Sequence, residues 1–304
     1  MKPSRRYRAY QLLIDSDLVL PELLDAASDG QVEQVDVSIR LGDVGHGAHA
    51  NRQQIGPYAW CATNELWLDV PSVGRFLVQQ GTSIIVQVHP GADEESVRLF
   101  LLGSVLGALL VQRGLLVLHG NAIRIGDQCL VCVGSSGIGK STLAAGFLER
   151  GHSILADDVV PVDGACRAVP GFPRVKLWRD SADLLGIDTE NLCQLRPGLN
   201  KFNYPLGPMF ESKALPIRWI YLLGKGPVEH PQFTLMQGMQ SFMPLFHNTY
   251  RRRFLEGMGG QADHLRVCGA LAAKAHVVRV QRPSTGFDLN GLIDAMLADA
   301  QRRG

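Results

Sequence analysis

A glycine-rich octapeptide at residues 134–141 constrains this chain more than any other feature. It reads Gly-Ser-Ser-Gly-Ile-Gly-Lys-Ser, which matches the pattern G-x-x-x-x-G-K-[ST] of phosphate-binding loops. Such a loop needs a strand before it and a helix after it, because backbone N–H groups must converge on phosphate oxygens at a helix N-terminus. The apolar run QCLVCV before the loop and the helical stretch 141–150, followed by Gly151, supply that context. The motif predicts an α/β fold with a nucleotide site.

The loop also predicts which residues contact the nucleotide. Lys140 is expected to reach the β- and γ-phosphates, and the Ser141 hydroxyl is expected to ligate Mg²⁺. The full set of predicted nucleotide contacts is Gly134, Ser135, Ser136, Gly137, Ile138, Gly139, Lys140, Ser141 and Thr142.

Two adjacent aspartates follow the helix, at the end of the apolar stretch SILADDVV. Asp157 and Asp158 could hold Mg²⁺ and deprotonate an incoming hydroxyl. The alternative is one metal-holding aspartate with a solvated neighbour. His119, at the end of another strand-like run, could tune the basicity of the pair or move a proton. Its alternative is a structural histidine at a strand end.

Taken together, His119-Gly120, the loop ending in Gly-Lys-Ser, Gly151-His152 and Asp157-Asp158 resemble the HPr kinase/phosphorylase family. The resemblance covers about residues 115 to 165. It implies a P-loop kinase domain of the HPr kinase type and an ATP-dependent, Mg²⁺-requiring phosphotransferase that acts on a serine hydroxyl.

The same resemblance implies a role for each matching residue. Asp157 would be the general base and His119 its partner, while Asp158 would be a metal ligand or an ordering carboxylate. Lys140 and Ser141 would contact the phosphates and Mg²⁺, with Ser141 and Asp158 as the implied metal ligands.

Two segments depart from the bacterial HPr kinases. Residues 1–95 do not look like their N-terminal domain, and 170–186 does not match their Gly-containing signature stretch. The chain is instead similar to HPr-kinase-related proteins of the lasso-peptide kinase type, which implies the C-terminal serine of a small precursor peptide as acceptor. The alternatives are a bifunctional HPr kinase/phosphorylase and a nucleotide-dependent switch without an external acceptor. A switch needs no acceptor base, so the acidic pair argues against it.

Basic residues of the second half are candidates for contacts with ATP or an anionic acceptor. They are Arg174, Lys176, Lys201 and the run that starts at Arg251. Arginine suits this role because it pairs bidentately with phosphate or carboxylate. Taken alone, each is more typical of a solvated surface charge.

The chain divides by pattern into a β-rich module at 1–95 and a P-loop kinase domain at 96–304. A hydrophobic fraction of 46% gives ample material for a core, and a net charge of +1 favours neither a nucleic-acid nor a membrane partner.

The longest apolar run, Leu99–Val111, is too short for a bilayer and predicts a buried helix. No secretory signal is recognised, so the cytoplasm is the expected location. A homo-oligomer is possible. Cys129 and Cys132 have metal-pair spacing, but their place in an apolar strand favours a core role.

Overall fold

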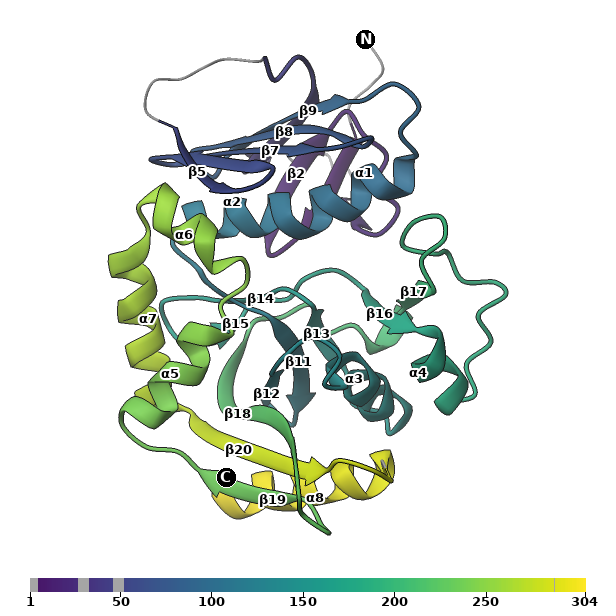
Figure 1. Cartoon of the computed structure of the whole chain (residues 1–304), viewed down its shortest axis with the longest axis vertical. Helices are drawn as coiled ribbons and strands as arrows, with labels where there is room; N and C mark the ends of the chain where they lie inside the picture. Colours follow the sequence, from purple (N-terminus) through teal and green to yellow (C-terminus); the bar gives the residue numbers. More distant parts are fainter. Residues whose placement is uncertain (1–4, 27–32, 46–51, 287) are drawn as a thin grey trace.

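The computed structural model describes residues 5–26, 33–45, 52–286 and 288–304. Within these residues the chain forms two nine-stranded sheets and a small two-stranded one. Figure 1 shows the first sheet at the top, one long helix beneath it, and the second sheet with its covering helices below. The fold is α/β with a β-rich N-terminal part, as the sequence predicts.

The first sheet is built from the first ninety residues. Its strand order is β3-β1-β2-β4-β9-β8-β7-β6-β5. Strands β5 to β9 form an antiparallel meander, whereas β4 pairs in parallel with both β2 and β9. The strands are β1 Arg5–Ala9, β2 Leu12–Ser16, β3 Leu24–Asp25, β4 Val37–Leu41, β5 Gln53–Gly56, β6 Ala59–Ala62, β7 Glu65–Val70, β8 Gly74–Gln79 and β9 Ser83–Val88.

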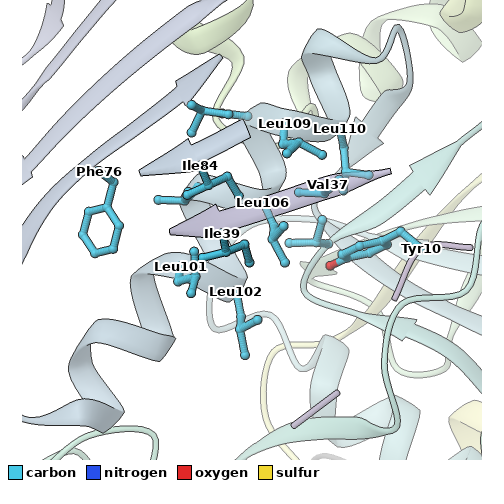
Figure 2. Packing of buried hydrophobic residues seen from close by; sticks show 14 of the residues in the cluster. Tyr10, Val37, Ile39, Phe76, Ile84, Leu101, Leu102, Leu106, Leu109 and Leu110 are labelled. Atoms are coloured by element: carbon cyan, nitrogen blue, oxygen red, sulfur yellow. The ribbon is translucent and has the colours of Figure 1, made fainter. Parts of the chain in front are cut away.

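The apolar run after residue 93 is a buried helix, as predicted. It comprises α1 Glu94–Phe100, a π-helical turn η1 Leu101–Val105 and α2 Leu106–Gln112, and Asp93 caps it by accepting from the Ser96 N–H at 2.7 Å. Figure 2 shows its leucines packed beside strand residues such as Ile39 and Ile84. The core of the first sheet therefore extends past residue 95, and the division of the chain at that residue stays a prediction.

The second sheet carries the glycine-rich loop at 134–141. Its strand order is β10-β14-β15-β18-β12-β11-β13, with β20 paired to β18 and β19 to β20. β12, β18 and β20 are mutually parallel, while β11 runs antiparallel between β12 and β13. The strands are β10 Leu116–Leu118, β11 Gly120–Ile125, β12 Gln128–Val133, β13 Ile154–Asp157, β14 Val160–Val162, β15 Arg167–Ala168, β18 Leu215–Gly226, β19 Gln232–Leu235 and β20 His276–Pro283.

After Gln128, strand β12 is apolar and buried, as expected for a strand with both faces of its sheet covered. Cys129 belongs to the hydrophobic cluster on one face and Cys132 to the cluster on the other, so the two thiols cannot bind one metal ion together. Both are buried free cysteines, as predicted. Burial raises the pKa of each thiol.

Helices cover the two faces of the second sheet. α3 and α8 contribute to one hydrophobic cluster, and α5 and α7 contribute to the other. No helix of the described residues is long and apolar enough to cross a membrane. The remaining elements are α3 Lys140–Glu149, β16 Arg174–Trp178, α4 Arg179–Leu184, β17 Lys201–Pro205, the 3₁₀ turn η2 Gly207–Met209, α5 Met239–His247, α6 Arg252–Met258, α7 Gln261–Lys274 and α8 Leu289–Arg303.

The stretch 241–259 is not one continuous helix. It breaks between α5 and α6, where Arg251 takes a left-handed φ of 48°. The Asn248 carbonyl accepts from the His119 N–H at 2.8 Å, and the Tyr250 N–H donates to Val117 at 2.8 Å. Pairing with the end of β10 therefore replaces helical hydrogen bonds here.

Candidate active site

The glycine loop leads from β12 into α3 and depends on glycine at two positions. Gly139 precedes the helix with a left-handed φ of 107°. Gly134 has a φ of 149°, and a Cβ on it would lie 2.9 Å from the Leu223 carbonyl oxygen. A side chain at Gly134 would therefore push the loop away from β18.

The Lys140 side chain bends back over this loop. It is buried, and its Nζ donates to the carbonyl oxygens of Gly134 at 2.8 Å and Ser135 at 3.1 Å. Burial lowers the pKa of this ammonium. Its neighbour Thr142 is turned elsewhere, since its hydroxyl hydrogen-bonds to Ser181 at 2.7 Å.

Asp157 ends β13 beside the loop. Its Oδ2 accepts from the Lys176 backbone N–H at 2.7 Å, and its Oδ1 accepts from the Asn121 side-chain amide. The Ser141 hydroxyl lies 3.5 Å from the same Oδ1. Burial, followed by the charge of Asp158, raises the pKa of Asp157. This carboxylate is thus placed next to the loop and holds a proton more readily than an ordinary aspartate.

The pKa of Asp158 is shifted in the opposite direction from that of Asp157. Its oxygens pair with Lys176 Nζ at 2.7 Å and with His119 Nδ1 at 3.3 Å. Burial alone raises its pKa, but the charge of Lys176 and the hydrogen bond from His119 outweigh burial and hold the pKa well below the usual range. Its backbone has a φ of 71°, and the Val159 N–H donates across it to the Asp157 carbonyl at 2.9 Å. A non-glycine residue in this conformation is strained.

The structure therefore corrects the expected pairing of His119. This residue contacts Asp158, whereas Asp157 accepts from the side chain of Asn121. The register of the strands explains this difference, since Asn121 lies opposite Asp157 in the pairing of β11 with β13. His119 precedes β11 and faces the turn at Asp158, which its ring also contacts through the Asp158 carbonyl at 3.1 Å. Asn121 lies two residues after His119 in the sequence. This proximity to a candidate site residue is the sequence signal that could have identified the Asn121 side chain.

A cavity of about 680 Å³ opens in front of these groups. It is lined from the loop by Gly134, Ser135 and Ser136, from the acidic turn by Asp158, and from the position before β11 by His119. The structure thus brings the start of the loop, His119 and Asp158 to one cavity. Asp157, Lys140 and Ser141 are not among its lining residues. Other polar and aromatic residues of its lining include Lys176, Trp178, Lys201, Tyr250 and Arg251.

The four basic candidates have different surroundings. Lys176 is buried and committed to Asp158. Lys201 lies with its Nζ 5.2 Å from the Trp178 ring and has no carboxylate partner among the residues described. Arg251 lines the cavity beside Tyr250. Arg174 is buried outside this cavity, where it donates to Asn203 at 2.5 Å.

Sequence reasoning did not single out Tyr250 or Trp178. Tyr250 reaches the cavity because two glycines of the long helix make room for its ring. A Cβ on Gly107 would lie 2.9 Å from Tyr250 Cε1, and one on Gly103 would lie 3.4 Å from its hydroxyl. The sequence signal for this close approach of Tyr250 was the pair Gly103 and Gly107, which are four residues apart on an apolar helix.

The oxygen donors at the loop suit a hard cation. Ser141 Oγ and Asp157 Oδ1 are hydroxyl and carboxylate oxygens 3.5 Å apart, the donor types that Mg²⁺ uses together with nucleotide phosphates. Asp158, the expected second ligand, has both oxygens engaged by Lys176 and His119, which disfavours it for this role. No group of three or more His, Cys, Asp or Glu residues able to hold a metal lies within the described part of the chain.

A glycine loop and an acidic turn meet at one cavity of this α/β protein, and comparison with known proteins shows which family the arrangement resembles. The family model for the HPr Serine kinase C-terminal domain matches residues 114–171. This segment contains His119, the loop and both aspartates. The resemblance to the HPr kinase/phosphorylase family is thereby confirmed.

Individual relatives match over short stretches. The HPr kinase/phosphorylase of Lactobacillus gasseri is 30% identical over 101 residues, which cover 30% of this chain and 32% of that enzyme. The HPr kinase/phosphorylase of Chlorobaculum tepidum is 46% identical over 44 residues, covering 14% of this chain and 13% of that enzyme. The solved HPr(Ser) kinase/phosphatase of Coxiella burnetii aligns over 61% of this chain and 95% of its own, with 15% identity and a TM-score of 0.26. The matched segments thus span about a third or less of the curated relatives.

Proposed function

We propose that this protein is an ATP-dependent kinase that transfers a phosphoryl group to a serine hydroxyl of a small peptide or protein. The observation that carries the proposal is the 3.5 Å separation of Ser141 Oγ from Asp157 Oδ1. It puts a carboxylate beside the loop that would hold the phosphates. A phosphoryl donor and an acceptor hydroxyl would meet there, which is the arrangement that phosphoryl transfer needs.

Asp157 is the proposed general base. A base must accept a proton in the transition state, and the raised pKa of Asp157 favours this, whereas the pKa of Asp158 is held well below its usual range. Asp158 instead orders the site through Lys176 and His119. Lys140 is the proposed contact to the transferring phosphate.

ATP and Mg²⁺ are the proposed cofactors. Ser141 is the proposed protein ligand of Mg²⁺, with Asp157 Oδ1 close to it. Bound Mg²⁺ would supply charge neutralisation at the phosphates. Lys201, a cation on the cavity wall without a carboxylate partner among the described residues, is available for a phosphate or for an acceptor carboxylate.

The favoured acceptor is the C-terminal serine of a lasso-type precursor peptide. Support comes from the segment after the acidic pair, since Lys176 and Trp178 of β16 line the cavity where acceptor recognition would take place. A flexible peptide end can enter such a cavity without a prepared docking surface. The alternative acceptor is HPr itself, which the family similarity of residues 114–171 favours.

The test is a transfer assay with purified protein and MgATP. HPr, a peptide ending in a free serine and the same peptide with an amidated C-terminus are offered separately, and added phosphate is followed by mass. Phosphorylation of the free-acid peptide supports the favoured acceptor. Phosphorylation of HPr alone would instead support the HPr kinase reading. ATP turnover without transfer to any of the three would support a switch protein.

A further inference from the structure

A second cavity, of about 470 Å³, opens between the first sheet and the start of α6. Figure 1 shows α6 next to the β5 end of this sheet, and the Asn64 N–H donates to the Met258 carbonyl at 3.2 Å across the junction. Phe100, Ser104 and Arg251 line both this cavity and the candidate active site, so the two spaces share a wall. We call the second cavity the arginine groove. The proposed reaction gives it no role.

The apolar walls of the arginine groove are accessible to solvent. Ile55, Leu68, Val70 and Phe100 line it and are only partly buried, because they pack at the edge of the core of the first sheet. Tyr58, also on the wall, is 51% exposed. Apolar surface that stays open at a cavity suits an apolar side chain of a binding partner.

Three consecutive arginines give the groove its charge. Arg251, Arg252 and Arg253 line it, and no aspartate or glutamate does so among the described residues. Arg251 and Arg253 are exposed, whereas the Arg252 guanidinium lies 4.8 Å from the Phe246 ring centroid. None of the three forms an ion pair within the described part of the chain, although Glu256 follows on the same helix. Like charges this close repel one another, and an anionic partner would relieve that repulsion.

The charges and the walls together define the chemistry of an occupant. It must bring a carboxylate for the guanidinium groups, which pair with carboxylates bidentately, and an apolar side chain for the walls. The backbone from Arg251 to Arg253 covers at most about 7 Å, so the acidic and apolar residues of an extended occupant lie within two or three residues of each other. A second copy of this chain has a net charge of +1 and offers no overall charge complementarity.

We propose that the arginine groove binds an acidic and apolar stretch of the acceptor, next to the segment that delivers the serine to the candidate active site. The inference rests on the proposed kinase function and adds the chemical character of the acceptor. Arg251 connects the two spaces, because it lines both of them. The groove also gives the first sheet a role in acceptor recognition through Tyr58 and its neighbours.

The experiment compares three pools of fluorescent decapeptides that end in serine. The other nine positions are drawn from Gly, Leu and Glu in the first pool, with Gln in place of Glu in the second and Lys in the third. Binding is followed by anisotropy in the presence of a non-hydrolysable ATP analogue. The wild-type protein should bind the Glu pool about threefold or more tightly than the Gln pool, and the Lys pool most weakly. Added salt should reduce these differences, because exposed charges are screened.

Charge reversal at the groove distinguishes recognition from a structural role. Arg253→Glu should make the Lys pool bind more tightly than the Glu pool, and Arg253→Gln should remove the preference. Tyr58→Ser should weaken the Glu and Gln pools alike, because it removes apolar surface and no charge. Arg266→Glu, at an exposed arginine of α7 that does not line the groove, is the matched control and should keep the wild-type order. An unchanged order in a folded Arg253→Glu protein would overturn the inference.

Other occupants are tested with the same variant. Sedimentation over a range of protein concentrations tests a second copy of the chain, and flotation with vesicles of phosphatidylglycerol and phosphatidylcholine tests a lipid surface. A dimer or a vesicle contact that Arg253→Glu abolishes, without a change in the order of the pools, would overturn the inference. Lost affinity of this variant for the ATP analogue would assign Arg253 to the nucleotide and would also overturn it.

Transfer from MgATP to the same pools separates this inference from the kinase proposal. Charge-dependent binding without any transfer would keep the groove and reject the kinase. Transfer with equal kcat/KM for the Glu and Lys pools would keep the kinase and reject the groove. A wild-type protein that binds none of the pools would also reject the groove.

Discussion

Asn121 lies opposite Asp157 in the pairing of β11 with β13 and donates its side-chain amide to the Asp157 carboxylate. Asn121 is buried, and its own Oδ1 has no hydrogen-bond partner. The hydrogen bond to the Asp157 carboxylate is therefore the one that the Asn121 side chain forms in these surroundings. It fixes the direction of Asp157 Oδ1 toward Ser141, which makes Asn121 a positioning residue for the proposed base.

Lys140→Ala should remove phosphate transfer while the protein still folds. The loop holds this ammonium over the expected phosphate site, and water cannot replace its charge in the transition state. The measurement is phosphate incorporation together with a melting curve. Lys225→Ala, at an exposed position on β18, is the matched control. A folded Lys140→Ala protein with normal turnover would rule out the nucleotide site.

Asp157→Asn should keep ATP binding and slow transfer by about 10²-fold or more, because the amide cannot accept the hydroxyl proton. Single-turnover rates at saturating ATP measure this. The opposite pattern, a lost ATP affinity with a normal rate at saturation, would make Asp157 a metal ligand and Asp158 the better candidate base.

The two aspartates should affect stability in opposite directions at neutral pH. The folded-state pKa of Asp158 is lowered, so its ionised form stabilises the fold above its unfolded-state pKa, and this contribution is lost as pH falls through the folded-state value. The folded-state pKa of Asp157 is raised, so its ionised form costs stability once pH exceeds the unfolded-state value. Asp158→Asn should lower the melting temperature at pH 7 by about 2 °C or more, and Asp157→Asn should raise it. Melting curves from pH 4 to pH 8 check both signs, and equal shifts would contradict this account.

His119 should couple energetically to Asp158 and not to Asp157. The His119 ring lies 3.3 Å from the Asp158 carboxylate, and residues in direct contact give non-additive double mutants. Transfer rates for His119→Ala, Asp158→Ala and the double variant measure the coupling. A larger coupling of His119 with Asp157 would show that the pairing changes when substrates bind.

Gly107→Ala should displace Tyr250 from the cavity wall. The added methyl group would lie 2.9 Å from the tyrosine ring, so we expect a loss of about 1–3 kcal/mol in the free energy of unfolding, with reduced transfer. Gly269→Ala is the control, since its Cβ meets nothing within 4 Å and alanine favours the helix by up to about 1 kcal/mol. Denaturant unfolding of both variants is the measurement, and similar effects from the two would contradict the packing argument.

The sequence by itself determined the parts of this protein whose physics is local. The glycines at 134 and 139 set loop conformations that side chains resist, and Lys140 and Ser141 follow at fixed spacing. The long apolar helix and the strand that contains Cys129 and Cys132 were also predictable, because burial on one or both faces leaves a periodic or continuous apolar pattern. Only the tertiary structure decided which side chains meet. His119 contacts Asp158 and Asn121 contacts Asp157 because of the register between strands far apart in the chain. Glu22 of the N-terminal module and Arg174 of β16 line the same cavity. Packing between the two layers brings them there, and such packing leaves no pattern in the sequence of either segment.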